Sequence, residues 1–163
     1  MNRKEYNLII NDIINNCEFL KISSIEHHGT SRLVHSKRVS FYSYLICKKL
    51  GLDYIAGARA GLLHDFFLSS DDRTKVERFT STFTHPKRAL RRANQYFSLN
   101  DKEQNIIVSH MFPVNVRLPK YMESWIVSLV DKVVGLYEFL VSFSFKQCCV
   151  PNLYLLLLIR IFN

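Results

Sequence analysis

Glycine is scarce in this sequence, and motifs that depend on it are missing. Only 5 of the 163 residues are glycine. A phosphate-binding loop needs several glycines within one short segment, because its backbone must approach the phosphates closely. No such segment occurs, and there is no internal repeat or low-complexity tract. The sequence therefore excludes nucleotide binding through a Gly-rich loop and argues against a repeat architecture.

The 4 cysteines lack the spacing of a metal-binding motif. No C-x-x-C pair occurs, so a zinc site built from thiolates is not supported. Cys148 and Cys149 are adjacent, which disfavours a disulfide between them. Cys17 and Cys47 lie in apolar helical patterns, and we expect both in the core. We therefore expect reduced thiols and a cytoplasmic protein.

Long hydrophobic runs are also lacking. The N-terminus alternates polar and apolar residues, unlike the continuous apolar segment of a signal peptide. The most apolar stretch, Leu153–Ile159, is far shorter than the roughly 20 residues that span a bilayer. We therefore predict no transmembrane segment. Residues 152–162 are expected to form a C-terminal apolar helix that is buried or joins subunits of a homo-oligomer, with peripheral membrane contact as a further alternative.

Cations are in excess. Lys and Arg number 22 against 14 Asp and Glu, which gives a formal charge of +8. This excess favours an anionic partner such as a nucleotide, a phosphate ester, nucleic acid or an acidic membrane surface. A basic surface that is merely solvated is the alternative. Charge alone does not choose among these partners.

Apolar side chains recur with helical spacing along most of the chain. Capping residues mark the expected helix starts at Thr30 or Ser31, at Asp53 and near Asn100, and Gly51 marks a helix end. The predicted helices cover about residues 6–20, 31–50, 53–65, 86–93, 101–112, 125–140 and 152–162. Residues 69–84 read as a polar loop or lid, and residues 141–145 as a candidate short strand. We expect one all-α domain over residues 1–163, with its core in about residues 30–140.

Four histidines and two aspartates fall on separate predicted helices or at their boundaries, where a bundle allows side chains to converge. They are His35, His64, Asp65, His85, His110 and Asp131. A buried carboxylate such as Asp65 is costly unless it is paired, hydrogen-bonded or bound to a metal. Imidazole and carboxylate together suit zinc, manganese, iron or nickel better than calcium. Because the set exceeds the needs of one ion, it would suit two divalent ions with Asp65 bridging them.

This ordered set resembles the HD-domain superfamily. The matching positions, in order, are His35, His64-Asp65, His85, His110 and Asp131. The local sequences AGLLHDFF, THPKRAL and VSLVDK match the family as well, and the similarity covers about residues 30–137. It implies an HD-domain helical bundle of about six to seven helices. His85 and His110 resemble the two additional histidines of the binuclear branch.

The resemblance also implies a ligand assignment and an activity. One ion would be held by His35, His64, Asp65 and Asp131, and a second by His85, His110 and the shared Asp65. A metal-activated water would then attack the phosphorus of a small phosphate ester or nucleotide-like substrate. Asp65 would be the catalytic residue that orients or deprotonates this water. The branch also contains mixed-valent di-iron oxygenases, so an oxygenase on the same ligands is the first alternative.

Two basic side chains are predicted to bind the substrate. Arg38 shares a helix face with His35 and could reach a phosphate bound at the metals. Lys132 follows Asp131 directly, at a position where the family often has a basic residue, and a structural ion pair is its alternative role. We therefore expect a small anionic substrate.

The segment after the His-Asp doublet departs from the family. Phe66-Phe67-Leu68 stand where many of its phosphohydrolases have a small residue, Gly and Lys. A phosphate-binding lysine is thereby lost, and the expected pocket wall is more apolar. A Gly-Tyr-Pro sequence is also lacking, so a cyclic-dinucleotide phosphodiesterase of that kind is not indicated.

A non-catalytic basic module that binds nucleic acid is the second alternative. Its candidate contacts are Lys87, Arg88, Arg91 and Arg92. Few aromatic residues interleave with this cluster, and no recognised binding motif surrounds it, so nucleic acid is the less favoured partner.

Overall fold

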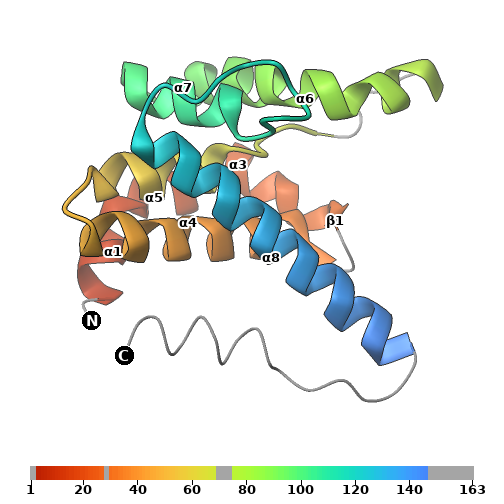
Figure 1. The fold of residues 1–163 in the computed structure, drawn as a ribbon, viewed down its shortest axis with the longest axis horizontal. Helices are drawn as coiled ribbons and strands as arrows, with labels where there is room; N and C mark the ends of the chain where they lie inside the picture. Colours follow the sequence, from red (N-terminus) through yellow and green to blue (C-terminus); the bar gives the residue numbers. More distant parts are fainter. Residues whose placement is uncertain (1–2, 28–29, 69–74, 147–163) are drawn as a thin grey trace.

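The computed structural model describes residues 3–27, 30–68 and 75–146, and these residues are mainly helical (Figure 1). Eight α-helices occur in this part of the chain. They are α1 (Arg3–Ile9), α2 (Asn11–Ile14), α3 (Cys17–Leu20), α4 (Arg32–Lys49), α5 (Tyr54–Leu63), α6 (Lys75–Tyr96), α7 (Asp101–Ser109) and α8 (Met122–Lys146). Between α3 and α4 lie the 3-10 helix η1 (Lys21–Ser24) and the antiparallel strands β1 (Glu26–His27) and β2 (Thr30–Ser31). The predicted all-α architecture is confirmed.

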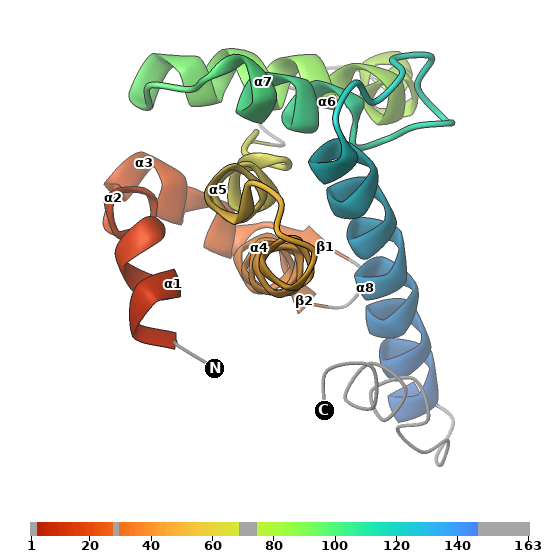
Figure 2. The ribbon, with the colours of Figure 1, turned by 60° about the vertical axis from the view of Figure 1, so that its left-hand side comes forward.

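Helices α4 and α5 form the centre of the fold. Figure 2 shows both nearly end-on, with α1–α3 on one side, α8 on the other and the pair α6 and α7 above α5. Helix α5 packs against α4, α7 and α8. The two central helices approach closely at Gly61, where a Cβ would lie 3.1 Å from the Cα of Ser40. This arrangement brings residues from distant parts of the sequence around the end of α5.

Local signals set several helix ends as predicted. The side chains of Ser31, Asp53 and Asn100 each accept a hydrogen bond from a backbone N–H in the first turn of α4, α5 and α7. After α4, Gly51 has a φ of 67°, and the N–H groups of Gly51 and Leu52 donate to carbonyls in the last turn. A left-handed residue at this position is the usual way in which a helix ends at glycine.

The single helix predicted for residues 6–20 is wrong. The chain instead forms α1, α2 and α3, because Asn16 has an extended backbone and its side chain accepts hydrogen bonds from two N–H groups at the start of α3. Asparagine side chains compete with the helical backbone in this way. The break also rotates the following residues, so Cys17 is exposed, contrary to our expectation, and Phe19 is fully buried. Cys47 is buried as expected.

The fourth helix starts much earlier than predicted. Helix α6 begins at Lys75, so residues 75–84 are helical rather than a loop or lid, and residues 69–74 lie outside the described residues. Pro86 lies inside α6 instead of in its first turn, and His85 is therefore interior as well. Inside a helix, proline removes one backbone donor and its ring crowds the carbonyl of residue i−4, which costs about 3 kcal/mol. His85, Ala89 and Ala93 continue one buried face past it, so packing outweighs the local preference.

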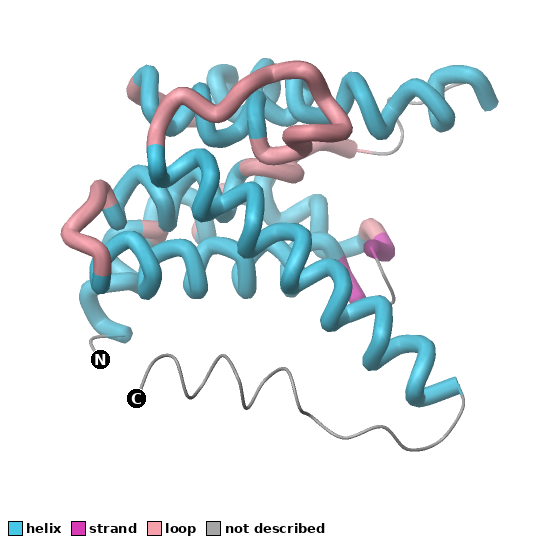
Figure 3. Tube along the Cα trace, viewed as in Figure 1, coloured by secondary structure: helices cyan, strands magenta, loops and turns pink. Residues whose placement is uncertain are grey.

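The ends of two other predicted elements are corrected. Helix α5 ends at Leu63 rather than at Asp65. Residues 141–145 continue α8 and form no strand, as Figure 3 shows, because a five-residue alternation is too short to distinguish strand from helix. The C-terminal helix predicted for residues 152–162 lies outside the described residues, as do Cys148 and Cys149. None of the described helices is long and apolar enough to cross a bilayer.

Candidate metal centre

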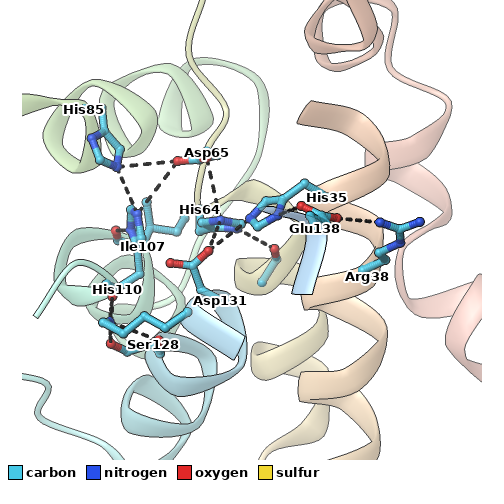
Figure 4. Close-up of polar contacts among 12 residues, drawn as sticks. His35, Arg38, His64, Asp65, His85, Ile107, His110, Ser128, Asp131 and Glu138 are labelled. Atoms are coloured by element: carbon cyan, nitrogen blue, oxygen red, sulfur yellow. Dashed lines mark hydrogen bonds and ion pairs between the residues drawn. The ribbon is translucent and has the colours of Figure 1, made fainter. Parts of the chain in front are cut away.

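Six side chains from distant parts of the sequence meet at the junction of α4, α5, α6, α7 and α8 (Figure 4). They are His35 in α4, His64 and Asp65 directly after α5, His85 in α6, His110 directly after α7, and Asp131 in α8. All are buried except Asp131, which is partly buried. These are the six residues for which the sequence predicts metal binding, and the structure brings them together.

Two of the histidines are held in the same way at the ends of their helices. His64 and His110 each follow the last residue of a helix, and each Nδ1 lies 2.8 Å from the carbonyl oxygen three residues before it. Because a carbonyl only accepts, Nδ1 carries the proton. In the neutral ring, Nε2 therefore offers its lone pair to the centre of the site. Among the described residues, the buried Nε2 of His64 has no hydrogen-bond partner.

The two carboxylate oxygens of Asp65 face different histidines. Oδ2 lies 3.9 Å from Nε2 of His64. Oδ1 lies 3.6 Å from Nε2 of His85 and 3.8 Å from Nε2 of His110. The last two nitrogens are 3.1 Å apart. Asp65 therefore stands between two groups of donors, as a bridging ligand would.

The other side of the site is centred on Asp131. Its Oδ1 lies 3.0 Å from Nε2 of His35 and 3.4 Å from Nε2 of His64. The second ring nitrogen of His35, Nδ1, lies 2.7 Å from Oε2 of Glu138, whose other oxygen accepts a hydrogen bond from Arg38. His35 is therefore clamped between two carboxylates of α8.

Charge within the site follows from these contacts. Burial would lower the pKa of His35, but hydrogen bonds to Asp131 and Glu138 outweigh it and raise that pKa to about 9. Burial would raise the pKa of Asp131, yet His35 and His64 hold it well below its usual value. Burial together with the nearby His64 lowers the pKa of His110 to about 4. At neutral pH, with no metal bound, the site therefore holds a protonated His35, an anionic Asp131 and an uncharged His110.

The spacing of these donor atoms suits metal coordination. Ligand atoms about 2.1 Å from one ion lie about 3.0–3.4 Å apart when they are neighbours in its coordination shell. In two groups of three residues, one donor atom from each residue lies within 4.8 Å of the other two: His35, His64 and Asp131, and His64, Asp65 and His110. The donor types are those preferred by divalent transition metals. Each of these two groups, which share His64, could therefore hold a metal ion.

Arg38 and Lys132, the two side chains predicted to bind substrate, have different surroundings. The Arg38 side chain is 41% exposed at the edge of the site and donates to Oε1 of Glu138 at 2.7 Å. The Lys132 ammonium donates to the His110 carbonyl at 3.1 Å and to the carbonyl and hydroxyl oxygens of Ser128 at 3.0 and 2.7 Å. Because an ammonium has three N–H donors, these acceptors use all of them. Lys132 thus secures the end of α7 that carries His110.

Of the two aromatic residues after the His-Asp doublet, Phe67 lies beside the site, whereas Phe66 packs in the core against Phe19 and Phe97. The centre of the Phe67 ring lies 5.3 Å from the centre of the His85 ring and 3.9 Å from the guanidinium carbon of Arg32. Arg32 also donates to the Phe67 carbonyl at 2.6 Å. These contacts fix the position of the segment that follows Asp65.

Glu138 is the residue that sequence reasoning missed. It lies seven residues after Asp131, which places both carboxylates on the same face of α8 two turns apart. An acidic residue on the inner face of an otherwise apolar helix was the signal that could have found it. His27 and His28 have no place in the ligand pattern of the family, and the sequence predicts them as loop residues near the mouth of the site. His27 lies instead in β1, and His28 lies outside the described residues.

Comparison with known families agrees with this geometry. The family model described as HD domain matches residues 32–135, which include all six converging residues. No curated protein sequence and no solved structure matches the chain.

Proposed function

The chain belongs to the HD-domain family, and from this premise we propose that it is a metal-dependent phosphohydrolase acting on a small phosphate ester or a nucleotide-like substrate. HD domains bind divalent metals, and the buried His and Asp groups of this chain could hold them. The observation that carries the proposal is the position of Asp65, whose two oxygens face different sets of imidazole nitrogens.

We assign the donors to two ions. His35, His64, Asp131 and one oxygen of Asp65 would hold the first, and His85, His110 and the other oxygen of Asp65 the second. When bound, divalent ions of this kind lower the pKa of a coordinated water toward neutrality and supply the nucleophile. Mn, Ni, Fe and Zn all suit this set of nitrogen and oxygen donors.

The residues of the chain then orient the reaction. Asp65 accepts a hydrogen bond from the attacking water, or takes its proton, because its carboxylate lies between the two groups of histidines. Arg38, exposed at the edge of the site, contacts the substrate phosphate. A substrate contact by Lys132 stays a prediction, and it requires the ammonium to leave Ser128 or His110. The wall formed by Phe67 limits access of bulk water.

A di-iron oxygenase is the second candidate, because the same bridging carboxylate and imidazole donors suit iron. The nucleic-acid module is less favoured, since two of its four cations are engaged with the protein. Arg92 pairs with Glu18 at 3.1 Å, and the Arg88 guanidinium lies 5.4 Å from the centre of the Phe67 ring.

The test is elemental analysis of protein purified without added metal, followed by turnover assays. We expect two ions per chain, and release of inorganic phosphate from phosphate esters or nucleotides that is stimulated by Mn²⁺ or Ni²⁺. Bound iron with oxygen consumption and no phosphate release would assign the oxygenase instead. Nucleic-acid affinity that survives chelation, without bound metal or turnover, would reject both enzymes.

The number of ions can be tested separately through His110. His110→Ala removes a donor from the second group only, so we expect the metal content to fall from two ions per chain to one. His27→Ala is the matched control, because this histidine has no place in the ligand pattern. A content of one ion in both the wild type and His110→Ala would establish a mononuclear site.

A further inference from the structure

The outer face of α8 exposes a row of large apolar side chains. Six of them, between 40% and 64% exposed, are Met122, Trp125, Leu129, Leu136, Leu140 and Phe143. Figure 2 shows α8 along one edge of the molecule. We call these six residues the α8 row. Contiguous apolar surface of this extent on a protein usually marks an interaction site.

The spacing within the α8 row is symmetric. Successive members are separated by three, four, seven, four and three residues. Steps of three and four keep side chains on one face of a helix and are typical of helices that pack against another helix. The row reads the same in both directions about a midpoint between Lys132 and Val133.

We propose that the α8 row is the interface of a homodimer in which α8 pairs antiparallel with α8 of a second copy. A twofold axis at the midpoint places Leu129 opposite Leu136 of the partner subunit. It likewise places Trp125 opposite Leu140 of the partner subunit, and Met122 opposite Phe143 of the partner subunit. An isologous interface requires a surface that is complementary to itself, and the symmetric spacing supplies this property. An unrelated partner would not require it.

The charges of α8 favour a second copy over a membrane. Helices that lie on anionic lipid carry Lys and Arg beside their apolar face. Among the described side chains of α8, Lys132 is the only cation, and its ammonium is held by Ser128 and the His110 carbonyl. Glu123 and Glu138 are buried. The exposed face is therefore nearly uncharged, as expected for a surface that packs on its own copy.

The size of the α8 row is adequate for a dimer. The row spans about 30 Å along the helix, at about 1.5 Å per residue. With about 200 Å² for a fully exposed large apolar side chain, the six residues expose on the order of 600 Å². Phe139, 55% exposed, lies beside the row and adds to this surface. A standard interface buries about 800 Å² per partner, so a pair of such rows with its polar rim reaches the required range.

The experiment measures the molar mass of the full chain in solution by light scattering and sedimentation over a wide range of concentrations. We expect twice the 19.1 kDa of one chain. Leu129→Glu and Leu136→Lys each place a charge opposite a leucine, and each is expected to raise the dimer Kd by at least about a hundredfold. The double variant L129E/L136K restores a pair of opposite charges across the interface and is expected to recover the dimer. Leu8→Glu, at a leucine 77% exposed on α1, is the matched control and should stay dimeric.

Trp125 reports on the same surface, because it is the only tryptophan of the chain. Its emission should shift to the red on dilution, in step with the fall in mass. A monomer at all concentrations would overturn the proposal. So would loss of the dimer in Leu8→Glu, or failure of L129E/L136K to recover what the single variants lose. A monomer whose Trp125 emission is already blue-shifted would show that another part of the same chain covers the α8 row. A monomer that co-sediments with phospholipid vesicles would show that the α8 row binds lipid. Both results reject the dimer.

Discussion

Asp65→Ala is expected to leave the protein without bound metal and to reduce turnover by about a thousandfold or more. The reason is geometric, since Asp65 is the only one of the six converging residues whose oxygens face both groups of histidines. Removing its carboxylate takes one ligand from each proposed ion, and it leaves the second ion with no carboxylate ligand. The measurement is elemental analysis of variant and wild type purified side by side, with phosphate release as the second readout.

Two further variants separate metal binding from folding. Asp65→Asn keeps the shape of the side chain but exchanges one acceptor oxygen for an amide NH₂ that cannot bind a metal, so it should lose metal while keeping the wild-type circular dichroism spectrum. Asp101→Ala, at an exposed position in the first turn of α7, should keep both metal and activity. Full metal occupancy in Asp65→Ala would show that Asp65 is not a metal ligand and would overturn the proposed site.

Several helix boundaries that depend on contacts within one turn were predictable from the sequence. The caps at Ser31, Asp53 and Asn100 and the left-handed Gly51 are of this kind, and the structure confirms each of them. The cap at Asn16 is also local but was missed, because the apolar spacing continues across it. The failure at Pro86 has a different origin. At Pro86, burial of one helix face outweighs the local preference of proline for a helix start, and such packing cannot be read from spacing alone.

The site was predictable in outline because the order of its residues along the chain resembles a family. That order identified the residues that converge, but not the way in which each is held. The sequence placed Asp65 within a helix and His85 at a helix boundary, whereas Asp65 follows α5 and His85 lies inside α6. Glu138 was missed because its role depends on the distance between α4 and α8, which only the fold determines.

Glu138→Ala is expected to weaken metal binding by about ten- to a hundredfold without changing the number of ions bound at saturation. Glu138 is buried and faces Nδ1 of His35, while Nε2 of His35 faces the site. Its carboxylate therefore holds the proton on Nδ1, so that Nε2 is the nitrogen that binds a metal once its own proton, which faces Asp131, is released. Without it, His35 can rotate or take the other tautomer. Metal titration of the metal-free protein measures both affinity and stoichiometry.

Stability should change as well, because the truncation leaves Arg38 and the Nδ1–H of His35 without this acceptor. A loss of about 3 kcal/mol in the free energy of unfolding is expected, as for other broken buried ion pairs, and urea titration measures it. Glu138→Gln should lose less metal affinity, since its amide oxygen still accepts from His35.

Glu123→Ala is the control for stability alone. Glu123 is also buried in α8, but it accepts from Lys102 and from the backbone N–H of Asp53, away from the six converging residues. Its truncation should lower stability and leave metal affinity unchanged. If Glu138→Ala and Glu123→Ala lower stability equally and neither changes metal affinity, Glu138 serves only the packing of α8 on α4. If Glu138→Ala lowers the number of ions at saturation, Glu138 is itself a ligand and the assignment of the first ion changes.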